Sequence, residues 1–239
     1  MPFDATLHAC RSRCTLCPSS VACVIQGGER EEIERWNASV DATLSLATPG
    51  KTLVEAGAPA AAIYTVRAGC LKSFTVDADG TERVRAFYLP GDIIGLDSLD
   101  AEEFPATVVA VTPSQVCRIS TSSVRHLMAE SPFLARRLLG RISTELAHAL
   151  TMAGDYSAEQ RLAAFLLSMR QRLNGKAGEV KLPMTRRDIA SYLRLATETV
   201  CRVLARLEQQ GQIHSDSKTV RLLDDRALRH TASPVACAA

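Results

Sequence analysis

The residues of this sequence best suited to chemistry are cysteines gathered near its start. Four of the eight cysteines lie in the stretch HACRSRCTLCPSSVACV, at Cys10, Cys14, Cys17 and Cys23. Closely spaced thiolates bind zinc or iron–sulfur clusters, and they can also form disulfides or take part in redox exchange. The spacing alone does not separate zinc from an iron–sulfur cluster, because both accept four thiolate ligands.

Two alternative uses of these cysteines find little support in the rest of the sequence. The opening MPFDATLHAC lacks a basic segment followed by an apolar one, and no apolar run is long enough to span a membrane. We therefore expect a cytoplasmic protein without a membrane partner, in a compartment where disulfides are rare. A thioredoxin-like role for Cys14 and Cys17 is not expected either, since no βαβ pattern surrounds the pair.

A second group of chemically active residues lies in the basic C-terminal part. Residues 155–239 contain 14 Lys/Arg and 9 Asp/Glu, a net charge of +5, whereas residues 1–154 contain 14 and 17, a net charge of −3. The stretch MTRRDIASYLRLATETVCRVLARLEQQGQI predicts two helices joined by a three-residue turn, with Thr185 and Thr197 as their N-caps. This pattern is typical of a helix-turn-helix, whose second helix enters the major groove of double-stranded DNA.

The exposed face of the second helix carries side chains that can read bases. Glu198 can accept a hydrogen bond from cytosine, and Arg202 can donate two to guanine. Other polar side chains nearby can hold phosphates, which position the protein without specifying a sequence. The predicted DNA-binding residues are Glu198, Cys201, Arg202, Thr185, Arg186, Thr197 and Thr199.

The segment between these two groups has the period of short strands. From about Thr43, runs rich in Val, Ile, Tyr, Phe and Thr alternate with turn signals such as Asp79-Gly80, and ATVVAVTPSQVCRIS adds two strands. This pattern favours a small antiparallel barrel or sandwich. The segment from Thr43 to Ser120 contains no histidine, so we do not expect an enzyme of the cupin-like metal oxygenase type. A short helix is predicted before it, in REEIERWNASV.

A long amphipathic helix is predicted in SPFLARRLLGRISTELAHALTMAG, with Ser131 as its N-cap. Leu138, Ile142, Leu146 and Leu150 recur every four residues along it. This apolar stripe favours dimerisation through the helix, with docking against the chain's own barrel as the alternative. The predicted α+β organisation is a cysteine-rich arm at 1–28, a β-barrel at 29–130, a dimerisation helix at 131–154 and a winged helix-turn-helix at 155–239.

The order of barrel, long helix and winged helix-turn-helix resembles that of the CRP/FNR family of bacterial transcription regulators. The stretches that carry the resemblance are GDIIGLDSL, AEQRLAAFLL and the helix-turn-helix itself. The arm spacing Cys14-x2-Cys17-x5-Cys23 is similar to that of the oxygen-sensing FNR branch, which takes a fourth ligand from its barrel, where this chain has Cys117. The resemblance implies a cyclic-nucleotide-binding-like jelly roll and a [4Fe–4S] cluster on these four cysteines, with Cys10 to spare and zinc as the alternative.

The resemblance further implies a homodimer that binds a palindromic TTGAT-like site beside RNA polymerase and releases it when oxygen degrades the cluster. The alternative is a zinc-stapled or cluster-free regulator with constitutive or thiol-redox-controlled DNA binding. No cyclic nucleotide is expected, since Pro105 and Ala106 stand where nucleotide-binding members have Arg-Ser. Two further departures lie in the helix-turn-helix, where Cys201 replaces a serine and Arg194 replaces the glycine of the turn.

Overall fold

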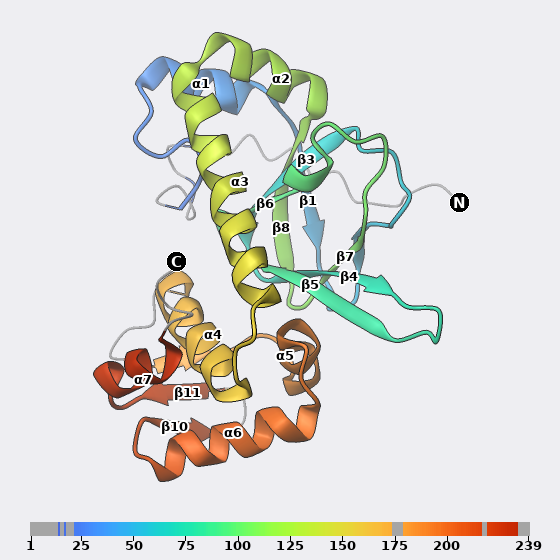
Figure 1. Cartoon of the computed structure of the whole chain (residues 1–239). Helices are drawn as coiled ribbons and strands as arrows, with labels where there is room; N and C mark the ends of the chain where they lie inside the picture. Colours follow the sequence, from blue (N-terminus) through green and yellow to red (C-terminus); the bar gives the residue numbers. More distant parts are fainter. Residues whose placement is uncertain (1–13, 15–16, 18–21, 174–178, 217–218, 234–239) are drawn as a thin grey trace. The chain divides into compact units, whose positions relative to one another are not determined.

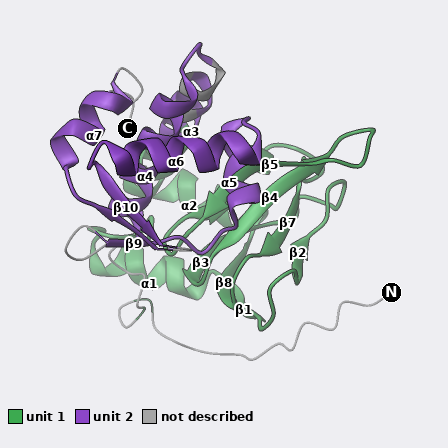
Figure 2. Cartoon of the chain, turned by 90° about the horizontal axis from the view of Figure 1, so that it is seen from below, with its two compact units in different colours: residues 1–142 green, residues 143–239 purple. Residues whose placement is uncertain are grey.

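The computed structural model describes Cys14, Cys17 and residues 22–173, 179–216 and 219–233, without the side chains of residues 148 and 151–153 (Figure 1). The chain divides into two compact units, unit 1 at residues 1–142 and unit 2 at residues 143–239 (Figure 2). Among the described residues, no helix combines the length and the apolar character needed to cross a bilayer.

Unit 1 contains two four-stranded antiparallel sheets, in the orders β1-β8-β3-β6 and β2-β7-β4-β5. Apolar side chains from both sheets, among them Val66, Leu71 and Val116, meet in one core, which confirms the predicted barrel. The hairpin expected at Asp79-Gly80 joins β4 to β5. The strands are β1 (Val40–Leu46), β2 (Thr52–Val54), β3 (Ala62–Ala68), β4 (Leu71–Val76), β5 (Glu82–Tyr88), β6 (Ile93–Ile94), β7 (Thr107–Ala110) and β8 (Ser114–Ser120), with a 3-10 helix η2 (Leu96–Ser98) after β6.

The first sheet is also covered on its outer face. There the helices α1 (Arg30–Ala38), α2 (Thr121–Glu130) and α3 (Pro132–Ala153) form a second core with Ile63 and Ile119 from the sheet and with Val24 and Ile25 from the end of the arm. We call the first cluster the inner core and the second the outer core. Because β3 lies between them, Ala62–Arg67 are all buried, so a polar side chain on this strand needs a partner.

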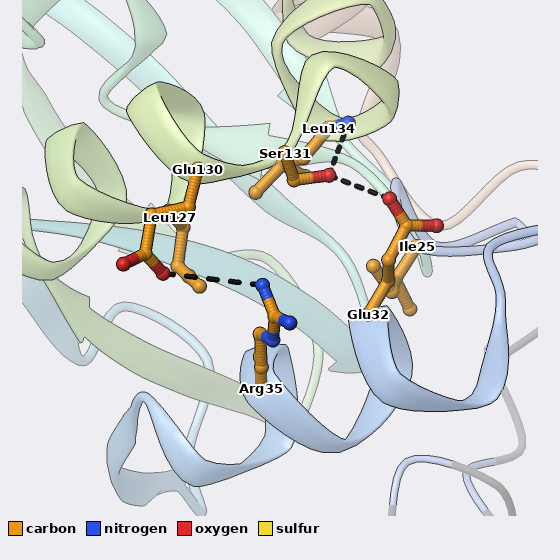
Figure 3. Close-up of a pocket in the computed structure, with 7 residues that line it drawn as sticks. All are labelled: Ile25, Glu32, Arg35, Leu127, Glu130, Ser131 and Leu134. Atoms are coloured by element: carbon orange, nitrogen blue, oxygen red, sulfur yellow. Dashed lines mark hydrogen bonds and ion pairs between the residues drawn. The ribbon is translucent and has the colours of Figure 1, made fainter.

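The start of α3 is fixed by the predicted cap (Figure 3). Ser131 Oγ accepts a hydrogen bond from the Leu134 backbone N–H (3.1 Å) and donates one to Glu32 Oε1 (2.6 Å) in α1. An ion pair between Arg35 and Glu130 (4.0 Å) joins α1 to the end of α2 beside the same small pocket. The end of the predicted first helix is corrected: α1 stops at Ala38, because Val40 already pairs with β8 as the first residue of β1.

Unit 2 packs helices on a three-stranded sheet of order β10-β11-β9. The predicted helix-turn-helix is present as two consecutive helices, and the expected wing follows as a two-strand antiparallel pair. The last helix was not predicted from the sequence. The elements are α4 (Ala158–Arg172), β9 (Glu179–Lys181), α5 (Arg186–Leu193), α6 (Thr197–Gln209), β10 (Ile213–Asp216), β11 (Thr219–Leu222) and α7 (Asp225–Ala232).

Candidate metal centre and nucleic-acid interface

Cys117 lies in the middle of β8, on the outer face of its sheet. Its Cα partners are Thr43 in β1 and Thr65 in β3. Neighbouring strand residues alternate between faces, and Val116 belongs to the inner core whereas Ile119 belongs to the outer core. The Cys117 side chain therefore faces the same side of the sheet as the helices and the arm.

The described cysteines of the arm lie against this outer face. Cys23 is buried in the outer core, and Cys14 packs against that core. The Cys14 backbone N–H donates to Asn37 Oδ1 (3.2 Å), and the Cys17 N–H donates to the Cys14 carbonyl (3.1 Å). The predicted spare thiol, Cys10, lies outside the described residues.

The charges of the four thiols affect one another. Burial, together with negative charge on the other three cysteines, raises the pKa of the Cys14 thiol to about 11. Burial also raises the pKa of Cys117, the guanidinium of Arg67 opposes that rise, and charge on Cys17 and Cys23 adds to it. Four thiolates held this close repel one another, so a cation that binds them relieves an electrostatic cost.

The four thiols do not stand at bonding geometry. Within the described part of the chain, no three His, Cys, Asp or Glu side chains are close enough together to hold a metal ion. None of the four cysteines forms a disulfide. The donor set fits zinc or an iron–sulfur cluster by its chemistry, and closing the site requires the arm and β8 to approach.

Two arginines of α3 hold the arm on either side of Cys23. Arg137 Nε donates to the Val24 carbonyl (3.1 Å), and Arg141 Nη2 donates to the Ala22 carbonyl (2.6 Å). On its other side Ala22 lies against Gly91, where any Cβ would collide with it and where φ is +94°. The position of the Cys23 segment is therefore coupled directly to α3.

The predicted dimer stripe of α3 is corrected at Leu138. Leu138 is fully buried in the outer core and Ile142 packs against that core, so both side chains face the chain's own unit 1. Leu146 and Leu150 are 59% and 66% exposed, and Leu139, one heptad before Leu146, is 60% exposed. The free apolar surface of the helix is thus formed by Leu139, Leu146 and Leu150.

In unit 2 the helix α5 begins with the expected capping box. The Asp188 backbone N–H donates to Thr185 Oγ1 (3.1 Å), and the Thr185 N–H donates to Asp188 Oδ2 (3.2 Å). Arg186 is half-buried and donates to Ser215 Oγ (3.1 Å) in β10, so it braces the wing against α5. Thr185 and Arg186, both predicted phosphate contacts, thus already take part in contacts within unit 2.

The second helix, α6, presents the predicted base-reading side chains to solvent. Glu198, Cys201 and Arg202 are exposed and share one face, while Val200, Val203, Leu204 and Leu207 are buried on the other. Arg202 donates to Thr199 Oγ1 (3.3 Å), one turn earlier. The predicted cap is one residue off: Ala196 is the N-cap, without a side-chain bond, and Thr197 is the first helical residue.

Arg194 ends α5 in the left-handed conformation, with φ 56° and ψ 45°, and is the one non-glycine residue with positive φ among the described residues. The substitution Arg194→Gly should therefore raise the free energy of unfolding by about 1 kcal/mol, because this conformation costs a residue with a Cβ about 1–2 kcal/mol. Urea denaturation of the full chain measures the change. The matched control Arg194→Ala removes the same side chain but keeps the Cβ, so an equal gain from alanine would contradict this account.

Comparison with known proteins gives the same two-part organisation. The cyclic nucleotide-binding domain family matches residues 46–131, and the Crp-like helix-turn-helix domain family matches residues 160–231. The transcriptional regulatory protein btr of Bordetella pertussis is 34% identical over 95% of this chain and 96% of its own length. The transcriptional activator protein FnrA of Stutzerimonas stutzeri is 34% identical over 75% of this chain and 76% of its own.

This chain is also similar to an anaerobic regulator and to a solved structure. An anaerobic regulatory protein of Haemophilus influenzae is 29% identical over 90% of this chain and 86% of its own length. The structure of FixK2 from Bradyrhizobium japonicum superposes with a TM-score of 0.72 and 32% identity, over 80% of this chain and 96% of that one. The two domains described above are therefore shared in the same order with transcription regulators.

Proposed function

This chain belongs to the CRP/FNR family of transcription regulators, which bind DNA and are not enzymes, and we propose that it is an oxygen-responsive member. The observation that carries the proposal is that Cys23 lies in the outer core and Cys14 packs against it, on the face of the first sheet to which Cys117 of β8 belongs. The similarity to an anaerobic regulatory protein supports a response of the same kind.

The group held by Cys14, Cys17, Cys23 and Cys117 is, in this proposal, a [4Fe–4S] cluster, with zinc as the alternative. When bound, such a cluster supplies an oxygen-labile tie between the arm and the barrel. The chain's part is to provide thiolates from two separate elements, so that holding the group requires the arm to lie against the outer face of the first sheet. We do not expect this chain to bind a cyclic nucleotide, because Pro105 and Ala106 offer no cation for the phosphate.

The chain's own contacts connect the arm to the dimer surface. Arg137 and Arg141 donate to the carbonyls on either side of Cys23, so a change in the arm acts directly on α3. On the same helix, Leu139, Leu146 and Leu150 offer an apolar surface to a second copy. Two copies present two recognition helices, which fit the two halves of a palindrome.

On the DNA, Glu198 and Arg202 would contact base edges in each TTGAT-like half-site, with Thr197 and Thr199 close to phosphates. Thr185 and Arg186 would add phosphate contacts at the start of α5, and Cys201 lies between the two base-reading residues. RNA polymerase is the expected protein partner at the promoter, and the cytoplasm, where the DNA lies, is the expected place of action.

Protein purified without oxygen should contain iron and acid-labile sulfide, show a broad visible absorbance, and bind a palindromic duplex as a dimer. Admitting air should bleach the absorbance and weaken DNA binding at least tenfold, about 1.4 kcal/mol. Metal analysis, absorbance and fluorescence anisotropy on the same samples measure this. Zinc in place of iron would support the zinc-stapled alternative, and unchanged DNA binding in air would remove the oxygen response.

A further inference from the structure

Two buried polar atoms on β3 lack a hydrogen-bond partner in the described part of the chain, and both lie beside Cys117. They are Thr65 Oγ1 and Arg67 Nε. A third such atom, Asp225 Oδ1 in unit 2, lies 2.6 Å from the guanidinium of Arg170 and so takes part in an ion pair. Among the described residues, the buried side-chain atoms left without any partner therefore lie together on β3 in unit 1, near a predicted ligand.

The backbone explains why both side chains face this region. Thr65 is the direct Cα partner of Cys117. Beyond it, Val66 pairs with Val116 but Ala68 pairs with Gln115, so Arg67 is the extra residue of a β-bulge. A bulge redirects a side chain and bends the strand locally, and bulges are frequent next to functional sites.

A guanidinium in this position is costly in the absence of an anion. Arg67 is only 9% exposed, and burying its Nε–H without an acceptor costs free energy. Its positive charge opposes the rise in the pKa of Cys14 from the arm and of Cys117 from β8. A negatively charged sulfur nearby could serve as the acceptor that Nε lacks.

We propose that Arg67 is the built-in counter-charge of the four-cysteine site, donating from Nε to sulfur of the bound group, with the Thr65 hydroxyl as a second donor. The inference rests on the proposed function and names two residues that would adjust the properties of the bound group. Arg67 binds no metal itself and acts as a positioning residue. Hydrogen bonds to the sulfurs and local charge set the reduction potential of an iron–sulfur centre, and partners of ligands affect metal affinity.

The test compares the full-length protein, reconstituted anaerobically, with Arg67→Met, Arg67→Lys and Arg118→Met. Arg118 is the matched control, because it follows Cys117 in β8 but faces the other side and pairs with Asp41 (2.7 Å). Three quantities are measured for each protein: iron retained against a chelator, the midpoint potential, and the thermal unfolding of the metal-free form.

For Arg67→Met we expect about 10- to 100-fold weaker iron retention and a more negative potential, with metal-free unfolding at the same or a higher temperature. Lysine should restore the potential in part, because it keeps the charge. Arg118→Met should match the wild type in retention and potential.

Equal retention and potential in Arg67→Met and the wild type would overturn the inference, as would a metal-free form destabilised in proportion to its iron loss. A wild-type protein without iron and sulfide would overturn the proposed function first, and this inference with it. The iron and sulfide content of the wild-type protein alone therefore distinguishes a failure of the proposed function from a failure of the Arg67 inference.

Discussion

Replacing Cys117 by serine should reduce the iron content of anaerobically purified protein from about four atoms per chain to almost none. Serine is nearly isosteric with cysteine, but its hydroxyl does not ionise near neutral pH and binds iron weakly. Because Cys117 is the predicted ligand on the barrel side, its loss leaves three arm cysteines with no thiolate from the sheet. Iron and sulfide analysis with visible spectra measures the effect.

Two controls separate ligand loss from general damage. Cys70 is a second barrel cysteine, 1% exposed, whose thiol hydrogen-bonds to the Leu71 carbonyl in the inner core, so Cys70→Ser should keep its iron. Cys10→Ser should also keep iron, because Cys10 is the predicted spare of the arm. Iron retained in Cys117→Ser, or lost equally in Cys70→Ser, would contradict the ligand assignment.

The elements that sequence reasoning predicted well are those whose signals are local. The capping box of Thr185 and Asp188 spans four residues, and the hairpin at Asp79-Gly80 needs only its own turn and flanking strands. The cap of α3 at Ser131 is equally local. Each of these features depends on a few neighbouring residues, so it can be predicted without knowing how the rest of the chain packs.

The apolar stripe predicted for dimerisation on α3 shows what a local sequence pattern does not predict. Leu138 and Leu146 belong to the same four-residue repeat, yet one is fully buried in the outer core and the other is exposed. The repeat identifies an apolar face but not its partner: the first turns of α3 pack in the outer core of unit 1, and the turns after Ile142 belong to unit 2. Only the three-dimensional packing assigns the partner of each residue.

Arg67 and the arm contacts could not be predicted for a related reason. A single arginine in the apolar run AAIYTVRAG was a signal, but the bulge that directs it toward Cys117 depends on pairing with a strand about fifty residues away. The hydrogen bonds from Arg137 and Arg141 to the arm join residues more than a hundred positions apart. Neither feature leaves a periodic trace in the sequence.

The arm and the DNA-reading helix differ in what a single substitution can test. Around the cysteines, removal of one ligand affects the whole site, because the thiolates act together. On α6, each side chain reads its own base, so losses are expected to be separable. This difference allows the DNA-binding half of the proposal to be examined base by base.

Replacing Arg202 by alanine should weaken binding to a TTGAT-like palindrome by about 1–3 kcal/mol per half-site, or about 5- to 150-fold. The side chain is exposed on α6 and held by Thr199 Oγ1 (3.3 Å), which orients the guanidinium before DNA arrives. A guanine with two acceptors in the major groove matches this fork. Fluorescence anisotropy at fixed salt measures the loss.

The decisive comparison pairs this variant with altered DNA. Changing the guanine of each half-site should cost the wild type about as much as the substitution does, but it should cost Arg202→Ala little, because the contact is already absent. Thr197→Ala is the control, since loss of a predicted phosphate contact should weaken all sequences about equally. If Arg202→Ala instead kept the full preference for guanine, Arg202 would be a backbone contact, and base reading would have to be assigned to Glu198 and Cys201, which share its face of the helix.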